Sequence, residues 1–303
     1  MVEGNMIEQF KPTRPIRLIA LDIDHTLLNM QQQLTERTER ALRAAIERGV
    51  QVVLATGKSF YSAAGLIQRL GLTTPCIFVQ GTTIYNPDGT LRHQQLLDPA
   101  IARQVITFAE DRGYSVALYS GTRVLMRQRD ARVFDLNVRY GEPMETIGPL
   151  QNVLDVLPVN KLVATGSDAK TVTALRWQLG MQINGSARLL QAGVPYMMEI
   201  LPPGASKGAM LKVLLKELGI APEEMLAAGD AENDIEMVQM AGVGVAVGNA
   251  SESLKKVADY IAASNDEDGV AEAVERFVLE AGETASETDA STVPVGASEV
   301  NGS

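Results

Sequence analysis

Two aspartates, Asp22 and Asp24, directly follow the mostly apolar run Ile16–Leu21. A short apolar run bounded by polar residues is typical of a buried strand. Both carboxylates are then expected at the C-terminal end of that strand, where open α/β sheets bind their ligands. Two carboxylates this close are costly to keep ionised without a cation or hydrogen-bond donors nearby. The pair therefore predicts a metal-dependent site, with Asp22 placed to act as a nucleophile.

Strand and helix patterns alternate in two stretches of the chain, before and after residues 85–192. Strands are expected at residues 50–55 and 76–79, with a helix at 36–48 and another that ends near residue 70. The pattern resumes with strands at 197–200, 225–228 and 243–247 and helices at 207–218 and 234–240. Such alternation is typical of an α/β protein with a parallel sheet.

The middle of the chain is less regular and predicts an inserted α+β domain over residues 85–192. The α/β core would then consist of residues 16–84 and 193–280. Residues 1–15 are mostly polar and are expected to form a flexible leader. Residues 281–303 contain no aromatic residue, Leu or Ile, which is typical of a disordered tail.

The net charge, the cysteine count and the apolar runs of the chain limit its possible binding partners and location. The 303-residue chain has a formal net charge of −10, which disfavours nonspecific binding to nucleic acid or to an anionic membrane. A small anionic substrate stays compatible with this charge, because a bound cation can reverse the field locally. The one cysteine, Cys76, excludes an internal disulfide and indicates a reducing, cytoplasmic location. No apolar run is long enough to predict a transmembrane helix.

Four polar clusters define the candidate site. Three follow predicted strands, and Lys207 opens a predicted helix. Any one of these clusters alone is more typical of a turn, a helix cap or a solvated surface. Their order and local context favour one site instead. The clusters are Asp22/Asp24, Thr56-Gly57, Lys207 and Asp230/Asn233/Asp234.

These residue types fit phosphoryl transfer, which needs an in-line nucleophile and positive charge around the transferring group. Aspartate is an established phosphoryl acceptor, and Asp24 could move protons to and from the leaving group. Mg²⁺ prefers oxygen ligands, which Asp22, Asp230 and the main-chain carbonyl of Asp24 could supply. Thr56 and Asn233 could hydrogen-bond phosphoryl oxygens, and Lys207 could neutralise charge.

At these positions the chain resembles the haloacid dehalogenase superfamily of phosphohydrolases, and within it the Cof-type hydrolases. The resemblance covers about residues 16–278. It rests on four ordered motifs and on two stretches similar to the Cof-type branch, Gly248–Ala250 and Ser264–Val270. The motifs are Asp22-Ile23-Asp24-His25-Thr26-Leu27, Thr56-Gly57-Lys58, Gly204-Ala205-Ser206-Lys207-Gly208 and Gly229-Asp230-Ala231-Glu232-Asn233-Asp234.

The resemblance implies a Rossmann-like core and identifies the inserted domain as a mobile α/β cap. It also implies Mg²⁺-dependent hydrolysis of a phosphate monoester. It implies that Asp22 is the nucleophile and Asp24 the acid/base. Asp230 would bind the metal, with Asp234 in contact with the metal or directly behind its ligands. The substrate would be a small phosphorylated metabolite, such as a sugar phosphate.

The chain departs from the family pattern at three positions. His25 replaces the usual glycine and either adds a polar group near the phosphate or points away and fills space; we favour the second interpretation. Lys58 replaces a common arginine and loses its bidentate fork. Gln80 replaces the asparagine of a typical Asn-Gly pair. The last two replacements could change substrate preference.

Two other functions remain open at this stage. A phosphosugar mutase would share the core and the phospho-aspartate but would isomerise its substrate. A non-catalytic phospho-ligand sensor would bind without turnover, and the presence of Asp24 argues against it. The sequence identifies neither the substrate nor the oligomeric state.

Overall fold

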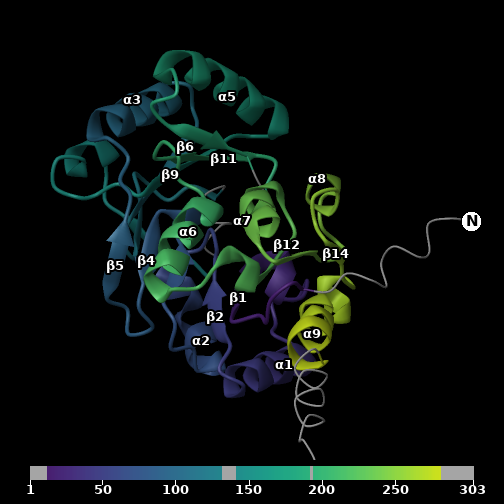
Figure 1. Cartoon of the computed structure of the whole chain (residues 1–303). Helices are drawn as coiled ribbons and strands as arrows, with labels where there is room; N and C mark the ends of the chain where they lie inside the picture. Colours follow the sequence, from purple (N-terminus) through teal and green to yellow (C-terminus); the bar gives the residue numbers. More distant parts are fainter. Residues whose placement is uncertain (1–11, 132–140, 192–193, 281–303) are drawn as a thin grey trace, which may run out of the picture.

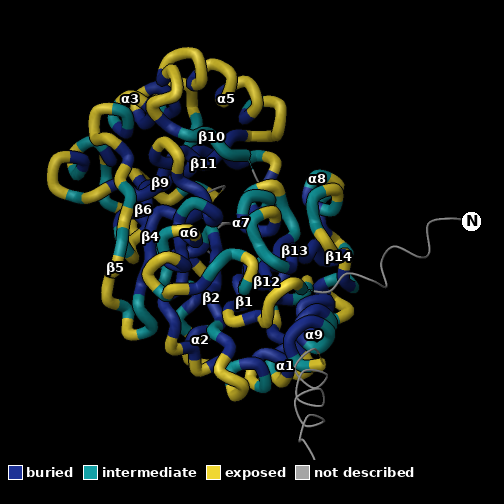
Figure 2. Tube along the Cα trace, viewed as in Figure 1, coloured by how far each residue is buried: buried dark blue, intermediate teal, exposed yellow. Residues whose placement is uncertain are grey.

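The computed structural model describes residues 12–131, 141–191 and 194–280. Residues 1–11 of the expected leader and all of the expected tail, 281–303, lie outside this part of the chain. Figure 1 shows two adjoining parts, one around the strands β1, β2 and β12 and one under the helices α3 and α5. Figure 2 shows that the central strands of both parts are buried, whereas β5 is partly exposed.

The first part is built on a five-stranded sheet with the order β14-β13-β12-β1-β2, and every neighbouring pair in it is parallel. In the register of this sheet, Leu21 lies beside Leu54 on one side and Ala228 on the other. The expected parallel sheet is therefore confirmed. Its strands are β1 (Leu18–Leu21), β2 (Gln51–Leu54), β12 (Met225–Gly229), β13 (Val243–Ala246) and β14 (Tyr260–Ile261).

Helices flank this sheet on both faces. In Figure 1, α1, α2 and α9 lie below the sheet, and α6 and α7 lie on its other side. Side-chain caps set several helix starts: Thr35 accepts a hydrogen bond from Thr38 N, and Ser206 from Ala209 N. These helices and the short α8 are α1 (Glu36–Glu47), α2 (Phe60–Leu70), α6 (Lys207–Leu218), α7 (Ile235–Met240), α8 (Glu252–Lys255) and α9 (Gly269–Val274).

The strand expected at residues 76–79 joins the parallel sheet only through an isolated bridge between Ala55 and Ile77. Its ladder partner is instead an antiparallel hairpin strand, because the chain reverses directly after it. The expectation of a regular third parallel strand is therefore wrong. The resulting three-stranded sheet has the order β3-β4-β5 and comprises β3 (Cys76–Phe78), β4 (Thr83–Tyr85) and β5 (Leu91–Gln94).

The second part contains a six-stranded sheet with the order β10-β11-β9-β6-β7-β8. Its strands are β6 (Ser115–Ser120), β7 (Arg123–Met126), β8 (Met144–Thr146), β9 (Lys161–Thr165), β10 (Arg188–Leu190) and β11 (Met197–Leu201). The sequence pattern predicts residues 197–200 as part of the resuming parallel core. That assignment is wrong, because β11 pairs antiparallel with β9 and β10.

Along each strand of this second sheet, successive side chains point to opposite faces of the sheet. Leu118, Leu162 and Ile200 face the helices α3 (Pro99–Glu110) and α5 (Ala169–Ile183) and share an apolar cluster with them. Tyr119 and Val163 belong to the main apolar cluster, which also contains the parallel sheet. One face of the second sheet is therefore turned toward the carboxyl ends of the parallel strands.

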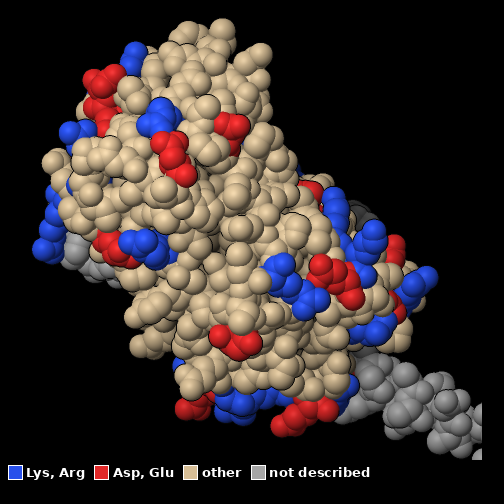
Figure 3. Space-filling view, turned by 90° about the vertical axis from the view of Figure 1, so that its left-hand side faces the viewer, with Lys and Arg blue, Asp and Glu red and all other residues tan. Residues whose placement is uncertain are grey.

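Among the described residues, none of the helices combines the length and the apolar character needed to cross a membrane. On the face shown in Figure 3, acidic and basic side chains are interspersed, so the negative net charge does not form one continuous patch there.

Gly81, between β3 and β4, allows the backbone of this hairpin to approach the backbone of Ser206 at the start of α6. Its φ is +86°, and a Cβ built on it would lie 2.0 Å from the carbonyl oxygen of Ser206. We expect Gly81→Ala to lower the free energy of unfolding by about 2–5 kcal/mol, through left-handed strain and overpacking.

The matched control is Gly49→Ala. Gly49 has a nearly equal φ of +85° but nothing within 4 Å of the added Cβ. It should lose only the conformational cost, about 1–2 kcal/mol. Urea denaturation of both variants measures the difference, and equal losses would show that the approach to Ser206 is not tight.

Candidate active site

The candidate site lies at the point where the strand order of the parallel sheet reverses. β1 lies between β2 and β12, and the chain continues from these strands toward opposite edges. Asp22 directly follows β1, and Asp230 directly follows β12. Ligands of open α/β sheets bind at this switch point. The fold therefore brings these two carboxylates together from positions more than 200 residues apart.

Lys207 connects the site's segments through its side-chain ammonium. Its Nζ donates to Asp22 Oδ1 at 2.6 Å and to Asp234 Oδ1 at 2.7 Å, and the residue is 1% exposed. Burial alone would lower the pKa of Lys207, but the carboxylates of Asp22 and Asp234 raise it above its ordinary value. Lys207 is therefore a fixed positive charge beside Asp22.

Asp234 lies behind the site and shapes the loop after β12. It is fully buried, and its second oxygen, Oδ2, accepts hydrogen bonds from the backbone N–H groups of Asp230 and Ala231, each at 3.1 Å. Burial raises the pKa of Asp234 despite its contact with Lys207. Because both of its oxygens accept hydrogen bonds, Asp234 holds the Lys207 ammonium and the backbone of Asp230 and Ala231 in position.

Asp230 accepts a hydrogen bond from the Thr26 hydroxyl at 3.2 Å. Burial is the largest cause that raises the pKa of Asp230, and the carboxylates of Asp22 and Asp234 raise it further. Carboxylate oxygens of these three aspartates lie within 4.8 Å of one another. Three carboxylates share a single lysine, so the site has an excess of negative charge and oxygen ligands that fit a hard divalent cation.

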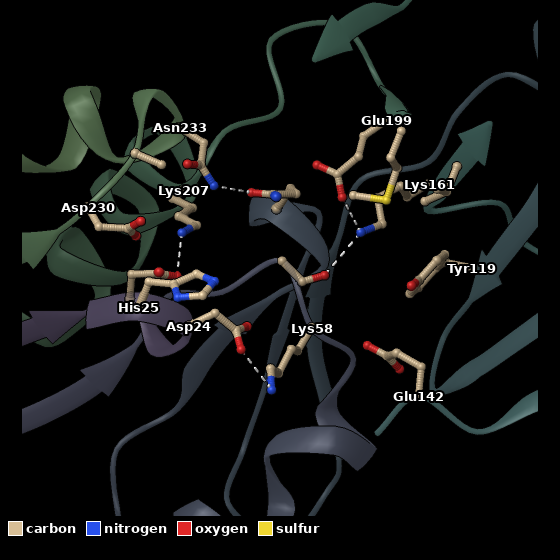
Figure 4. Close-up of a pocket in the computed structure, with 16 residues that line it drawn as sticks. Asp24, His25, Lys58, Tyr119, Glu142, Lys161, Glu199, Lys207, Asp230 and Asn233 are labelled. Atoms are coloured by element: carbon tan, nitrogen blue, oxygen red, sulfur yellow. Dashed lines mark hydrogen bonds and ion pairs between the residues drawn. The ribbon is translucent and has the colours of Figure 1, made fainter. Parts of the chain in front are cut away.

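Asp24 and His25 form the part of the pocket next to Asp22. The Asp24 carboxylate pairs with Lys58 Nζ at 3.1 Å. His25 has a left-handed backbone, with φ 60° and ψ 6°, which explains why glycine is common at this position of the motif. The expectation that His25 points away is wrong, because its side chain lines the pocket (Figure 4).

The segment after β2 contributes Thr56 and Gly57. Thr56 is 1% exposed, and its Oγ1 accepts from the backbone N–H of Lys58 at 3.2 Å, as expected for a strand-to-helix turn. Gly57 lines the pocket. A Cβ at Gly57 would lie 2.6 Å from the side-chain nitrogen of Gln80. A contact between Thr56 and a phosphoryl group stays a prediction.

Asn233 faces the pocket from the loop after β12 and is held by Gln80. Its Nδ2 donates to Gln80 Oε1 at 3.0 Å, while its buried Oδ1 has no hydrogen-bond partner among the described residues. Gln80 itself has a left-handed φ of 59°. Gln80, one of the three departures from the family pattern, thus contacts the segments of both Gly57 and Asn233.

The opposite wall of the pocket comes from the second sheet and from the segment before β8. Figure 4 shows its residues across the pocket from Asp24, His25 and Lys207. None of these residues is predicted from the sequence. The available signal was a charged residue inside each of two apolar strands, Lys161 in β9 and Glu199 in β11. The polar members of this wall are Tyr119, Glu142, Lys161 and Glu199.

The family model of haloacid dehalogenase-like hydrolases matches residues 19–274. The chain belongs to this family. Phosphatase YwpJ of Bacillus subtilis is 30% identical over 280 residues, which cover 84% of this chain and 98% of that protein. The chloroplastic endoribonuclease YBEY of Arabidopsis thaliana is 35% identical over 287 residues, which cover 91% of this chain but only 49% of that protein.

Among solved structures, a haloacid dehalogenase-like hydrolase from Bacteroides thetaiotaomicron matches with a TM-score of 0.79 and 31% identity, covering 86% of this chain and 99% of that one. These findings confirm the resemblance to Cof-type members of the family and the α/β fold with a Rossmann-like core and a cap. They also confirm the assignment of the chain as a phosphatase enzyme.

Lys207→Met tests the electrostatics of the site. The substitution leaves the Asp22 and Asp234 carboxylates buried without their cation, and we expect a loss of about 3–5 kcal/mol in the free energy of unfolding at neutral pH. Burial already raises the pKa of Asp234, and the loss of Lys207 removes the charge that lowers it, so this pKa rises further in the folded variant. The loss should therefore shrink as the pH falls toward about 4, where the unfolded chain also becomes protonated.

Urea denaturation from neutral pH to about pH 4, in buffer containing a chelator, measures this effect. The matched control is Lys212→Met on the same helix, because the Lys212 side chain is 57% exposed and pairs with Glu236 at the surface. Its loss should stay within about 0.5 kcal/mol. A similar, pH-independent loss in both variants would contradict the electrostatic interpretation.

Proposed function

We propose that this chain is a Mg²⁺-dependent phosphatase that hydrolyses small phosphorylated metabolites of the sugar-phosphate type through an aspartyl-phosphate on Asp22. The observation that carries the proposal is the position of Asp22, which lies at the switch point beside the fixed charge of Lys207 and lines the pocket together with Asp24 and Asp230. The names of relatives support the class of reaction, since they include phosphatases.

In the first step, a carboxylate oxygen of Asp22 attacks phosphorus, and the bond from phosphorus to the leaving oxygen breaks. The Asp24 carboxyl gives its proton to that oxygen, so the leaving group departs as a neutral alcohol. The contact with Lys58 supports only the position of Asp24, because it holds the carboxyl two residues from the nucleophile and at the pocket wall.

In the second step, Asp24 takes a proton from water, whose oxygen attacks phosphorus. The bond between phosphorus and the Asp22 oxygen breaks, which regenerates the carboxylate and releases inorganic phosphate. Lys207 stabilises negative charge on Asp22 and on the phosphoryl oxygens. We assign further phosphoryl contacts to the Thr56 hydroxyl, the Gly57 segment and the Asn233 amide.

Mg²⁺ would bind to Asp22, Asp230 and the main-chain carbonyl of Asp24, with Asp234 supporting the loop behind them. When bound, the cation supplies positive charge that stabilises the transferring phosphoryl group. The fit is supported by the clustered carboxylates and by the raised pKa of Asp230, which reflects burial first and then repulsion from Asp22 and Asp234 that a cation would relieve.

We further propose that residues 85–192, together with β11, act as a cap over a core of residues 16–84 and 202–280. Cap closure would exclude water from the pocket during the first step. A cytoplasmic location is supported by the single, buried Cys76.

Asp24→Asn should separate the two chemical steps. 4-Nitrophenyl phosphate has a leaving group that departs without a proton, so the first step should proceed while the second slows by about 10²–10⁴-fold. Rapid mixing should then show a burst of nitrophenolate close to one equivalent per enzyme. Asp22→Asn should show neither burst nor turnover, with a loss of about 10³-fold or more.

The control for these variants is Asp155→Asn, because the Asp155 side chain is 79% exposed and far from the chemistry in the second part of the molecule. It should match wild type. Turnover by Asp22→Asn at the wild-type rate would sink the phospho-aspartate mechanism. Isomerisation of a hexose phosphate without release of phosphate would favour a mutase, and binding without turnover a sensor.

Removal of the metal gives an independent prediction. A chelator should abolish hydrolysis of 4-nitrophenyl phosphate, and added Mg²⁺ should restore it. Asp230→Asn should raise the Mg²⁺ concentration for half-maximal activity by about 10–100-fold, because a ligand and a negative charge are lost. Full activity of wild type in excess chelator would refute the metal requirement.

A further inference from the structure

The wall of the pocket opposite Asp22 consists of side chains from one face of the second sheet. Tyr119 of β6, Lys161 of β9 and Glu199 of β11 all face the pocket, because alternate residues of neighbouring strands share a face. Val163 and Met197 lie on the same face and make part of the wall apolar. A leaving group bound between this wall and the phosphate site would meet these five side chains.

Lys161 is already engaged by the protein and pairs with Glu199. Its Nζ donates to Glu199 Oε1 at 2.7 Å and to the backbone carbonyl of Gly57 at 3.0 Å, and it lies 4.2 Å from the centre of the Tyr119 ring. An ammonium has three N–H groups, and two of them are used in these hydrogen bonds, while the ring adds a cation–π attraction. Lys161 therefore serves to fix Glu199 and the Gly57 segment.

Glu199 has one oxygen left for a ligand. The residue is 3% exposed and lines the pocket, and its Oε2 is buried without a hydrogen-bond partner among the described residues. Leaving a buried acceptor unpaired costs about 1–3 kcal/mol, and more for a charged group. Such an atom at a pocket wall indicates that a bound molecule supplies the donor.

The other charged groups make an anionic ligand tail unfavourable here. Glu142, also in this wall, accepts from both the N–H and the hydroxyl of Ser59 and adds a second negative charge. The lysines of the pocket are paired: Lys58 with Asp24, and Lys207 with Asp22 and Asp234. A second anionic group on the substrate would thus face Glu199, while each lysine in the described lining of the pocket, Lys161 included, is already paired with a carboxylate.

We propose that Glu199 Oε2 binds the leaving group of the substrate and selects phosphate monoesters whose leaving group carries a neutral hydrogen-bond donor, a hydroxyl or an N–H, over those that carry a second anionic group. This inference rests on the proposed phosphatase function. The accepted substrates are then polyol-like or amide-bearing monophosphates, and carboxylate-bearing monophosphates of the same length are rejected.

Three matched pairs of substrates test the inference, each differing only in a terminal hydroxymethyl or carboxylate group. They are 2-hydroxyethyl phosphate and phosphoglycolate, glycerol 3-phosphate and 3-phosphoglycerate, and glucitol 6-phosphate and 6-phosphogluconate. For the pair that is turned over best, kcat/KM of wild type should favour the hydroxymethyl member by about tenfold or more. A preference for the carboxylate member would overturn the inference without any variant.

Glu199→Gln should shift this ratio by about tenfold or more toward the carboxylate member. The glutamine oxygen stays on Lys161, and its NH₂ group replaces the free acceptor with a donor. Because the readout is a ratio, a loss of folded enzyme cancels. The matched control is Glu145→Gln, in which Glu145 also pairs with a cation, Arg123, but is exposed at the surface; its ratio should equal that of wild type.

The outcomes separate the two proposals. If wild type does not hydrolyse 4-nitrophenyl phosphate or any of the pairs in the presence of Mg²⁺, the proposed phosphatase function fails. If it does hydrolyse them but Glu199→Gln leaves the ratio within about twofold of wild type, the inference about Glu199 fails alone.

Discussion

The whole site depends on one buried ammonium, that of Lys207. It joins Asp22, 185 residues away in the sequence, to Asp234, 27 residues away, and so fixes α6, the end of β1 and the loop after β12 in one arrangement. A charge buried this deeply is tolerated only because two carboxylates compensate it. The same contacts leave Asp230 with excess negative charge around it, which is the condition that a divalent cation satisfies. Structural pairing and the capacity for metal binding therefore have the same origin.

Much of this arrangement could be predicted from the sequence, because its determinants are local. Asp22 and Asp230 each directly follow an apolar run, and such runs become neighbouring parallel strands in an alternating α/β chain. The register then leaves little freedom: Leu21 lies beside Ala228, so the residues after both strands meet at one edge. Lys207 follows a helix-capping serine, which fixes its place in the first turn of α6.

The opposite wall could not be predicted in the same way, because it depends on pairing between distant segments. The run Met197–Leu201 is apolar enough for a buried strand of either sheet, and only its antiparallel pairing with β9 shows which one it joins. The ion pair of Glu199 with Lys161 depends on this pairing and cannot be predicted from the sequence. The direction of the His25 side chain could not be predicted for a different reason. It depends on the left-handed backbone at this residue, which turns the side chain into the pocket.

Several polar contacts between the two parts lie at the segment after β2. Lys161 binds the carbonyl of Gly57, and Glu142 binds the N–H and the hydroxyl of Ser59, the residue that caps α2. The same segment supplies Lys58 to Asp24 and Gly57 to the pocket floor. Because Lys161 also holds Glu199, a shift of the cap changes the backbone beside the phosphate site and the leaving-group wall together. Under the proposed function, recognition of the leaving group and assembly of the phosphate site would therefore be coupled through a few polar contacts.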